Sequence, residues 1–228
     1  MRQIIFATLL WGCLNGFTSA AVLCPEDIRD LPSHRGDVVV YSPQTQFTVF
    51  RSVNREDLTK EAMKIRPGDT DGLTLLDYEQ RVSVSFLKEE SGCLAPQIQV
   101  MLGAARAAVY IALEVPADSC RFQAVYAHEM KHAKAAQRVF DTTALQLKKQ
   151  AQAWLNTPEL AQLISQTERP ETEIKPVLEQ MAATAIRRAL TRLDGENKLI
   201  DGEGEAERMA ERCAPPAAPV LQVGTDLR

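Results

Sequence analysis

The chain has 228 residues, of which 45% are hydrophobic and 25% are charged, and its formal net charge is −4 at pH 7. This length and hydrophobic content suit a single domain with a packed core. Surfaces that bind nucleic acids need a basic stripe, so the acidic balance argues against a nucleic-acid partner. After the N-terminus no apolar run approaches the ~20 residues of a membrane-spanning helix, so we expect no integral membrane span.

The N-terminus has the three parts of an export signal. Arg2 provides a positive charge, residues 4–17 form an apolar stretch, and small residues follow. We expect cleavage after Ala20, with Ala21 as the alternative, which makes residues 1–20 a signal peptide and the mature protein periplasmic or secreted. A lipoprotein signal ending at Cys13 is the less favoured alternative, because a bulky tryptophan stands inside its recognition sequence.

The cysteines agree with export into an oxidising compartment. Removal of Cys13 with the signal leaves an even number, namely Cys24, Cys93, Cys120 and Cys213. None has CxxC spacing, so we expect disulfides rather than a thiolate metal site. The sequence leaves the pairing open, and our preferred pairing joins Cys93 to Cys120 and Cys24 to Cys213.

The chain up to about Pro116 is rich in predicted strands. Alternating or β-branched runs indicate them, and the segment 54–79 between two of them is expected to be a short helix or loop. The runs are 38–42, 46–53, 81–89, 97–102 and 107–116. They predict a sheet, antiparallel or mixed, in the N-terminal part of the fold.

The chain from Arg121 to Cys213 is helical in pattern. A long helix is expected from Arg121 toward Trp154, with Ser119 as its cap. Another helix is expected to start at Thr157, and one apolar stripe predicts a further helix over 171–193. Strands first and helices later predict an α+β fold.

The motif His128-Glu129-Met130-Lys131-His132 lies on the expected long helix. The chain has three histidines, and two of them stand four residues apart here. Residues i and i+4 share one helix face, so both imidazoles can reach one zinc ion at about 2.0–2.1 Å. Glu129 lies beside that position and can take a proton from a zinc-bound water. This HExxH arrangement indicates a zinc peptidase with Zn²⁺ as cofactor; an amphipathic helix with solvated histidines is the less favoured alternative.

A catalytic zinc needs a third protein ligand. His34 is the remaining histidine, but it lies far upstream and is expected to be a surface loop residue. Acidic residues near the C-terminus are the other candidates, namely Asp201, Glu203, Glu205 and Glu207. We favour Glu205, with Glu207 next, and the competing interpretation is a solvated acidic helix face.

These features resemble secreted HExxH metallopeptidases of the zincin type. More narrowly, the chain is similar to a group of exported bacterial proteins in which a cysteine shortly precedes the HExxH helix and an I-D…E…C pattern closes the domain. The matching residues are Cys120, the motif at 128–132, Ile200, Asp201, Glu205 and Cys213. The resemblance covers roughly 93–213, supports Glu205 as a ligand, and implies one zincin-like domain over 21–213. Residues 214–228 are expected to be a loosely ordered tail.

The resulting prediction is an exported zinc metallopeptidase whose substrates are peptides or cell-envelope proteins. Glu129 is expected to act as general base on the zinc-bound water. An edge strand within 100–115 is expected to hold an extended substrate by β-augmentation. The alternative is a non-catalytic zinc-binding or scaffold module of the cell envelope, which Lys131 and the long helical half favour.

Overall fold

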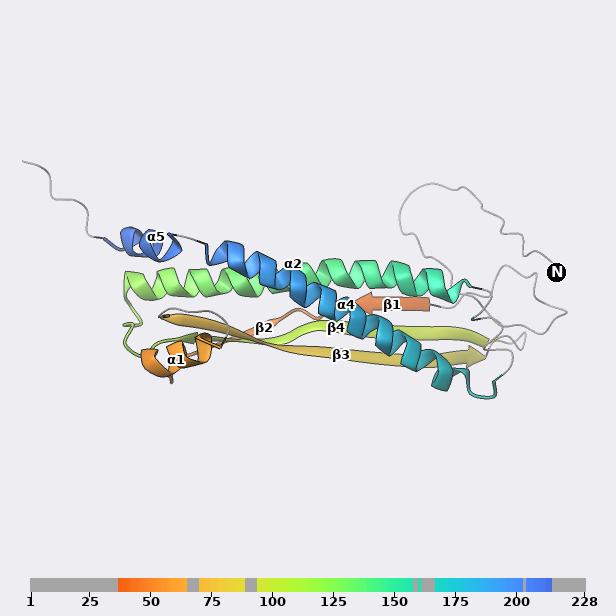
Figure 1. Ribbon diagram of the computed structural model, residues 1–228. Helices are drawn as coiled ribbons and strands as arrows, with labels where there is room; N and C mark the ends of the chain where they lie inside the picture. Colours follow the sequence, from red (N-terminus) through yellow and green to blue (C-terminus); the bar gives the residue numbers. More distant parts are fainter. Residues whose placement is uncertain are drawn as a thin grey trace, which may run out of the picture.

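The computed structural model describes residues 37–64, 70–88, 94–157, 160, 167–202 and 204–214. Its elements in chain order are β1 (Asp37–Tyr41), β2 (Gln46–Phe50), α1 (Arg55–Ala62), β3 (Gly72–Lys88), β4 (Leu94–Ile111), α2 (Cys120–Leu155), α4 (Pro170–Ile200) and α5 (Glu205–Arg212) (Figure 1). Apart from the short helix α1, strands thus come first and helices follow, which confirms a mixed fold of this order. The expected signal peptide and the residues beyond Ala214 lie outside the described part of the chain.

The strands form one mixed sheet with β4 at its centre. β3 pairs antiparallel with β4 along the whole of both strands. β1 and β2 pair with β4 in parallel, and their first residues stand opposite Gln97 and Arg106. These two short strands therefore lie in line along the other side of β4. The expectation that a strand within 100–115 forms an edge of the sheet is wrong, because β4 is central: residues 100–101 and 106–110 pair with β3 on one side and with β1 or β2 on the other.

A β-bulge at Ala105 decides which side chains of β4 face the helices. Asp77 of β3 pairs with Arg106 and Tyr78 pairs with Ala104, so Ala105 has no partner in the β3 register. One extra residue reverses the alternation of faces. The buried side chains accordingly change from even to odd numbers; they are Ile98, Val100, Leu102 and Ala104, then Ala107, Val109 and Ile111.

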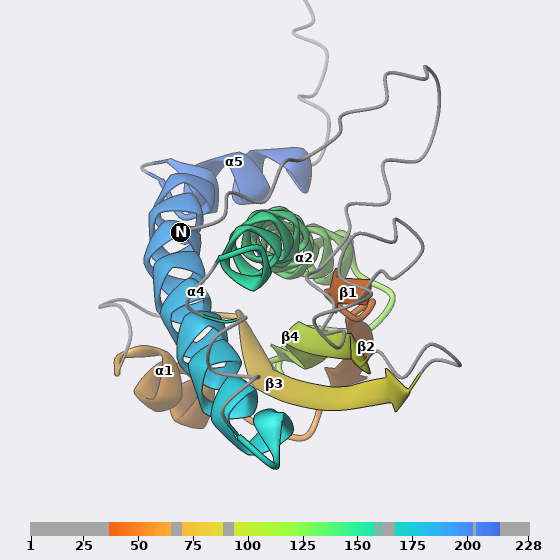
Figure 2. The same ribbon diagram turned by 90° about the vertical axis from the view of Figure 1, so that its right-hand side faces the viewer.

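The two long helices cover one face of the sheet (Figures 1 and 2). α2 lies along the sheet, and α4 packs beside α2 and against β3. The helices and the sheet enclose a hydrophobic core that includes Val100, Leu102, Phe140, Leu147, Leu155, Ile174 and Leu178. Burial of each large apolar side chain contributes about 1.5–3 kcal/mol. No helix within the described ranges has the length and apolar character needed to cross a membrane.

The helix boundaries follow local capping. Ser119 Oγ accepts a hydrogen bond from the backbone N–H of Phe122 at 3.1 Å, which confirms the expected start of α2. α2 runs on to Leu155 as predicted, and α4 extends beyond the predicted 171–193 at both ends. The expected helix after Thr157 falls mostly on residues outside the described ranges.

A disulfide joins Cys120, the first residue of α2, to Cys213, which follows α5; their Cα atoms are 5.5 Å apart. The expected pairing of Cys120 with Cys93 and of Cys213 with Cys24 is therefore wrong. The physical reason is that α5 folds back beside the start of α2 (Figure 1). Cys24 and Cys93 themselves lie outside the described residues.

Candidate metal centre

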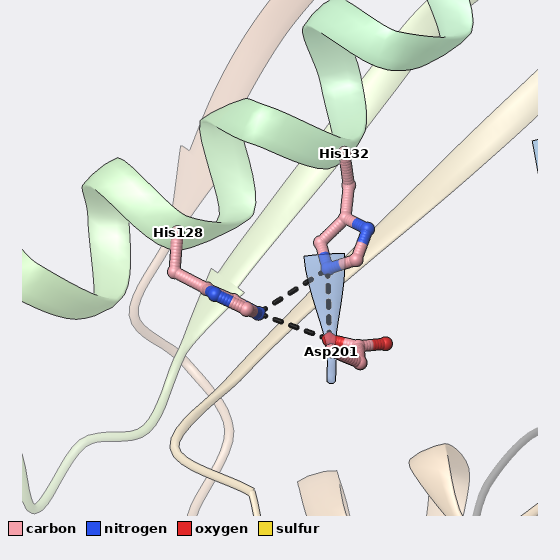
Figure 3. Close-up of side chains that lie close together, drawn as sticks. All are labelled: His128, His132 and Asp201. Atoms are coloured by element: carbon pink, nitrogen blue, oxygen red, sulfur yellow. Dashed lines mark hydrogen bonds and ion pairs between the residues drawn. The ribbon is translucent and has the colours of Figure 1, made fainter. Parts of the chain in front are cut away.

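Three polar side chains meet where α4 ends beside the first third of α2 (Figure 3). His128 and His132 project from one face of α2, and Asp201 is the residue that ends α4. The Oδ1 atom of Asp201 is 3.1 Å from Nε2 of His128 and 3.1 Å from Nε2 of His132. The two Nε2 atoms are 3.3 Å apart. Three potential metal ligands from two helices thus converge on one point.

These separations suit a tetrahedral zinc ion. Zinc bonds imidazole nitrogen and carboxylate oxygen at about 2.0–2.2 Å, so tetrahedral ligands stand about 3.3–3.6 Å from one another. The three donor atoms lie 3.1–3.3 Å apart. A cation among them would need only a slight widening of the group. Three protein ligands also leave the fourth tetrahedral position for a water molecule.

The second nitrogen of each imidazole also has an acceptor beside it. Nδ1 of His132 is 2.9 Å from Oδ1 of Asn197 on α4. Nδ1 of His128 is 3.4 Å from Oε1 of Glu205 at the start of α5. An acceptor at Nδ1 places the ring proton there and leaves the Nε2 lone pair for a metal. Both rings are thereby oriented with Nε2 toward Asp201.

Glu205 is held as an anion next to this group. Lys131 Nζ donates to its Oε1 at 2.7 Å, and Arg208 Nε donates to its Oε2 at 2.9 Å. The hydrogen bond from Lys131 is the main cause that lowers the pKa of Glu205 from 4.5 to about 2, against the opposing effect of burial. Sequence reasoning chose Glu205 as the third ligand. In the structure Asp201 faces both Nε2 atoms, and Glu205 faces the opposite nitrogen of His128.

The surroundings of His132 favour positive charge. Burial alone would lower the pKa of His132, but hydrogen bonds with Asp201 and Asn197 and the charges of Glu129 and Asp201 outweigh burial and raise it above 6.5. An environment that stabilises a proton on an imidazole also attracts a metal cation. The charges around His132 therefore favour a cation at the point on which the three ligand atoms converge.

Glu129 of the motif lies between α2 and β3 and is 2% exposed. Its Oε2 accepts a hydrogen bond from Thr74 Oγ1 of β3 at 2.8 Å, and the same hydroxyl is 3.2 Å from the Glu129 carbonyl oxygen. Gly72 makes this approach possible, because a Cβ at that position would stand 2.6 Å from Glu129 Oε1. The carboxylate is thus oriented by the strand beneath it, close enough to act on the charge of His132.

Sequence reasoning identified part of this group. It found both histidines and Glu129, and it named Asp201 among several acids without choosing it. It missed Asn197, which is four residues before Asp201 on the same face of α4, and the pair Gly72 and Thr74. Of the other ligand candidates considered, Glu207 is exposed, whereas Glu203 and the histidine His34 lie outside the described residues.

Comparison with known proteins found no matching protein-family model, no matching curated protein and no matching solved structure. The chemistry of the site must therefore be argued from its own geometry.

Proposed function

We propose that the protein is an exported zinc-dependent metallopeptidase of zincin-like type. His128, His132 and Asp201 hold the ion, and Glu129 is the general base. The observation that carries the proposal is the convergence of two Nε2 atoms and one carboxylate oxygen within 3.1–3.3 Å. Glu129 of the same motif is buried, and its charge acts on His132. The resemblance to zincins through HExxH adds support.

The chemistry follows from the roles of these side chains. A zinc ion held by His128, His132 and Asp201 would lower the pKa of a bound water to about 7 and would polarise the carbonyl of the substrate. Glu129 would serve as the general base that takes up a proton from the attacking water and returns it to the leaving amine. Thr74 holds one carboxylate oxygen of Glu129 and so sets the direction of the other. Asn197 and Glu205 keep the imidazoles in the tautomer that can bind metal.

The substrate class in this proposal is a peptide or an envelope protein. β4 is central in the sheet, so it offers no free edge over most of its length. β3 is the strand that carries Thr74, and in the described part of the chain it pairs with β4 alone. We therefore assign β3 as the strand on which an extended substrate would align by main-chain hydrogen bonds.

The test compares wild type with Glu129→Gln, both purified with the disulfide intact. The amide keeps an oxygen that can accept from Thr74, so the fold and zinc content should be retained. Hydrolysis of a peptide library should fall by about 10²–10⁴-fold, the usual contribution of a general base. Glu207→Gln is the matched control, because Glu207 is exposed and should leave both zinc and activity unchanged. Undiminished hydrolysis in Glu129→Gln would exclude the proposed role.

A non-catalytic zinc or scaffold module is the second candidate. It is favoured by the enclosure of the site, since the side chains of His128 and His132 are only 6% and 11% exposed. In that case zinc would join α4 to α2 and stabilise the fold without turnover. It predicts about one zinc per chain, a higher Tm with zinc, and no zinc-dependent cleavage of any peptide. Cleavage that disappears in Glu129→Gln would rule it out.

A further inference from the structure

α5 is docked on α2 with little apolar contact. Among its described side chains Glu205 is the buried one, and residues 207, 208 and 210–212 are exposed. A helix of eight residues is also too short to be stable by itself in water. Hydrophobic packing of the described side chains therefore does not explain why α5 lies beside α2.

Polar and covalent contacts provide the attachment instead. Lys131, whose side chain is 44% exposed, is paired with the buried Glu205 at the start of α5, so among the described side chains this end of the helix is held by polar contacts alone. At the other end of α5, Cys213 is bonded to Cys120. The disulfide is thus the covalent tether of α5, and it is attached to the same helix that carries both histidines.

We propose that the Cys120–Cys213 disulfide is a redox control on metal binding at the site of His128, His132 and Asp201. The inference rests on the zinc site proposed above. Asp201 ends α4, which packs on α2 and β3, so we expect it to keep its place without the disulfide. Glu205 reaches Nδ1 of His128 only when α5 is docked.

The size of the effect follows from the contact that is lost. Removal of an acceptor behind a metal-binding histidine costs about 10–100-fold in metal affinity. We therefore expect the reduced protein to bind zinc about 10–100-fold more weakly than the oxidised protein. The loss should come from the His128–Glu205 contact and not from any ligand.

The covalent step is a thiol–disulfide exchange. The two thiols of Cys120 and Cys213 lose two protons and two electrons as the S–S bond forms. A disulfide of glutathione or of a thiol–disulfide oxidoreductase accepts them and is reduced to two thiols. Binding equilibria are reciprocal, so zinc must make this disulfide harder to reduce by the same factor by which oxidation strengthens zinc binding.

The first experiment measures zinc affinity by competition with a chromophoric chelator. It compares the oxidised wild type, the double variant Cys120→Ser/Cys213→Ser, Glu205→Ala, and the three substitutions combined. We expect the double variant and Glu205→Ala each to bind zinc about 10–100-fold more weakly, and the combination to be no weaker than either. Circular dichroism checks that α2 and α4 remain folded.

Equal zinc affinity in the wild type and the double variant would overturn the redox control while the zinc site stands. Independent, multiplicative losses in the combined variant would equally overturn the route through Glu205. Absence of zinc from the oxidised wild type would instead remove the zinc site and the redox control together, so the two failures are distinguishable.

The reciprocal experiment titrates the disulfide in glutathione redox buffers with and without saturating free zinc, and counts thiols by mass. Zinc should shift the equilibrium toward the disulfide in the wild type. His128→Ala, which lacks a ligand but retains both cysteines, should show no shift. A zinc-independent equilibrium in the wild type would contradict the coupling.

Discussion

The close approach of β3 to Glu129 predicts that Gly72→Ala destabilises the protein. A Cβ at residue 72 would stand 2.6 Å from Glu129 Oε1, 2.7 Å from Val125 Cγ1 and 2.9 Å from Glu129 Cγ. All three distances are under 3.0 Å, which real Cβ atoms essentially never show. Glu129 and Val125 are 2% and 5% exposed, so neither side chain can move away into solvent.

The change in the free energy of unfolding of Gly72→Ala is the sum of two opposing effects. Forced displacement of packed side chains costs about 1–3 kcal/mol. Replacement of a glycine restricts the unfolded chain and offsets about 0.4–1 kcal/mol of that cost. We expect the free energy of unfolding to fall by about 1–2 kcal/mol. For a domain of this size the Tm should then fall by about 2–8 °C.

Urea unfolding and thermal melting measure this loss, and Gly195→Ala provides the matched control. Gly195 lies on the exposed face of α4, where a Cβ would meet nothing within 4 Å. Alanine there should raise the free energy of unfolding by about 0.5–1 kcal/mol, because glycine is unfavourable inside a helix. A Gly72→Ala protein as stable as wild type, beside a stabilised Gly195→Ala protein, would refute the tight contact between β3 and Glu129.

Three further predictions concern the metal ligands, the pH dependence and the core. Asp201→Ala should weaken zinc binding by about 100-fold or more, whereas Glu205→Ala removes no ligand and should weaken it by about 10–100-fold. Equal losses of zinc affinity in chelator competition would contradict the assignment of Asp201, rather than Glu205, as the third ligand. The pKa of Glu205 is lowered from 4.5 to about 2 in the folded protein, so its contribution to stability is complete above pH 4.5 and is lost as the pH falls toward 2. The difference in urea midpoint between metal-free wild type and Glu205→Gln should therefore shrink over that range, and a constant difference would contradict the ion pair. Leu178→Ala should lower the free energy of unfolding in urea by about 2–5 kcal/mol, because Leu178 is 1% exposed in the core between the long helices. A loss below about 1 kcal/mol would show that this core is not tightly packed.

Features set by local residue order could be predicted from the sequence. The Ser119 cap, the long helix after it and the shared face of His128 and His132 all depend on neighbours within a few residues. The sequence could not show which acid faces both Nε2 atoms, because Asp201 and Glu205 would share one face on a continuous helix. In the structure α4 ends at Asp201, and Gly204, with φ of 79°, turns the chain before α5 begins. The two acids therefore approach His128 from different sides.

β4 shows the limit of strand prediction. Its sequence contains glycine and two alanines at 103–105, which have low β propensity, so two separate strands were expected there. Pairing with β3 continues through this stretch and joins them into one strand with a bulge. Contacts between residues distant in the sequence therefore determined that β4 is one strand. Such contacts also determined that Cys213 pairs with Cys120.

The bond between Cys120 and Cys213 closes a covalent ring, since the two cysteines are 93 residues apart in the chain. The ring contains α2, α4 and α5, and so all three ligands of the candidate metal centre. Cleavage of one peptide bond in the connection between Leu155 and Pro170 would open the ring without separating the histidines from Asp201. The protein can thus be cut once at that connection and still carry all three residues of the candidate metal centre in one covalent molecule.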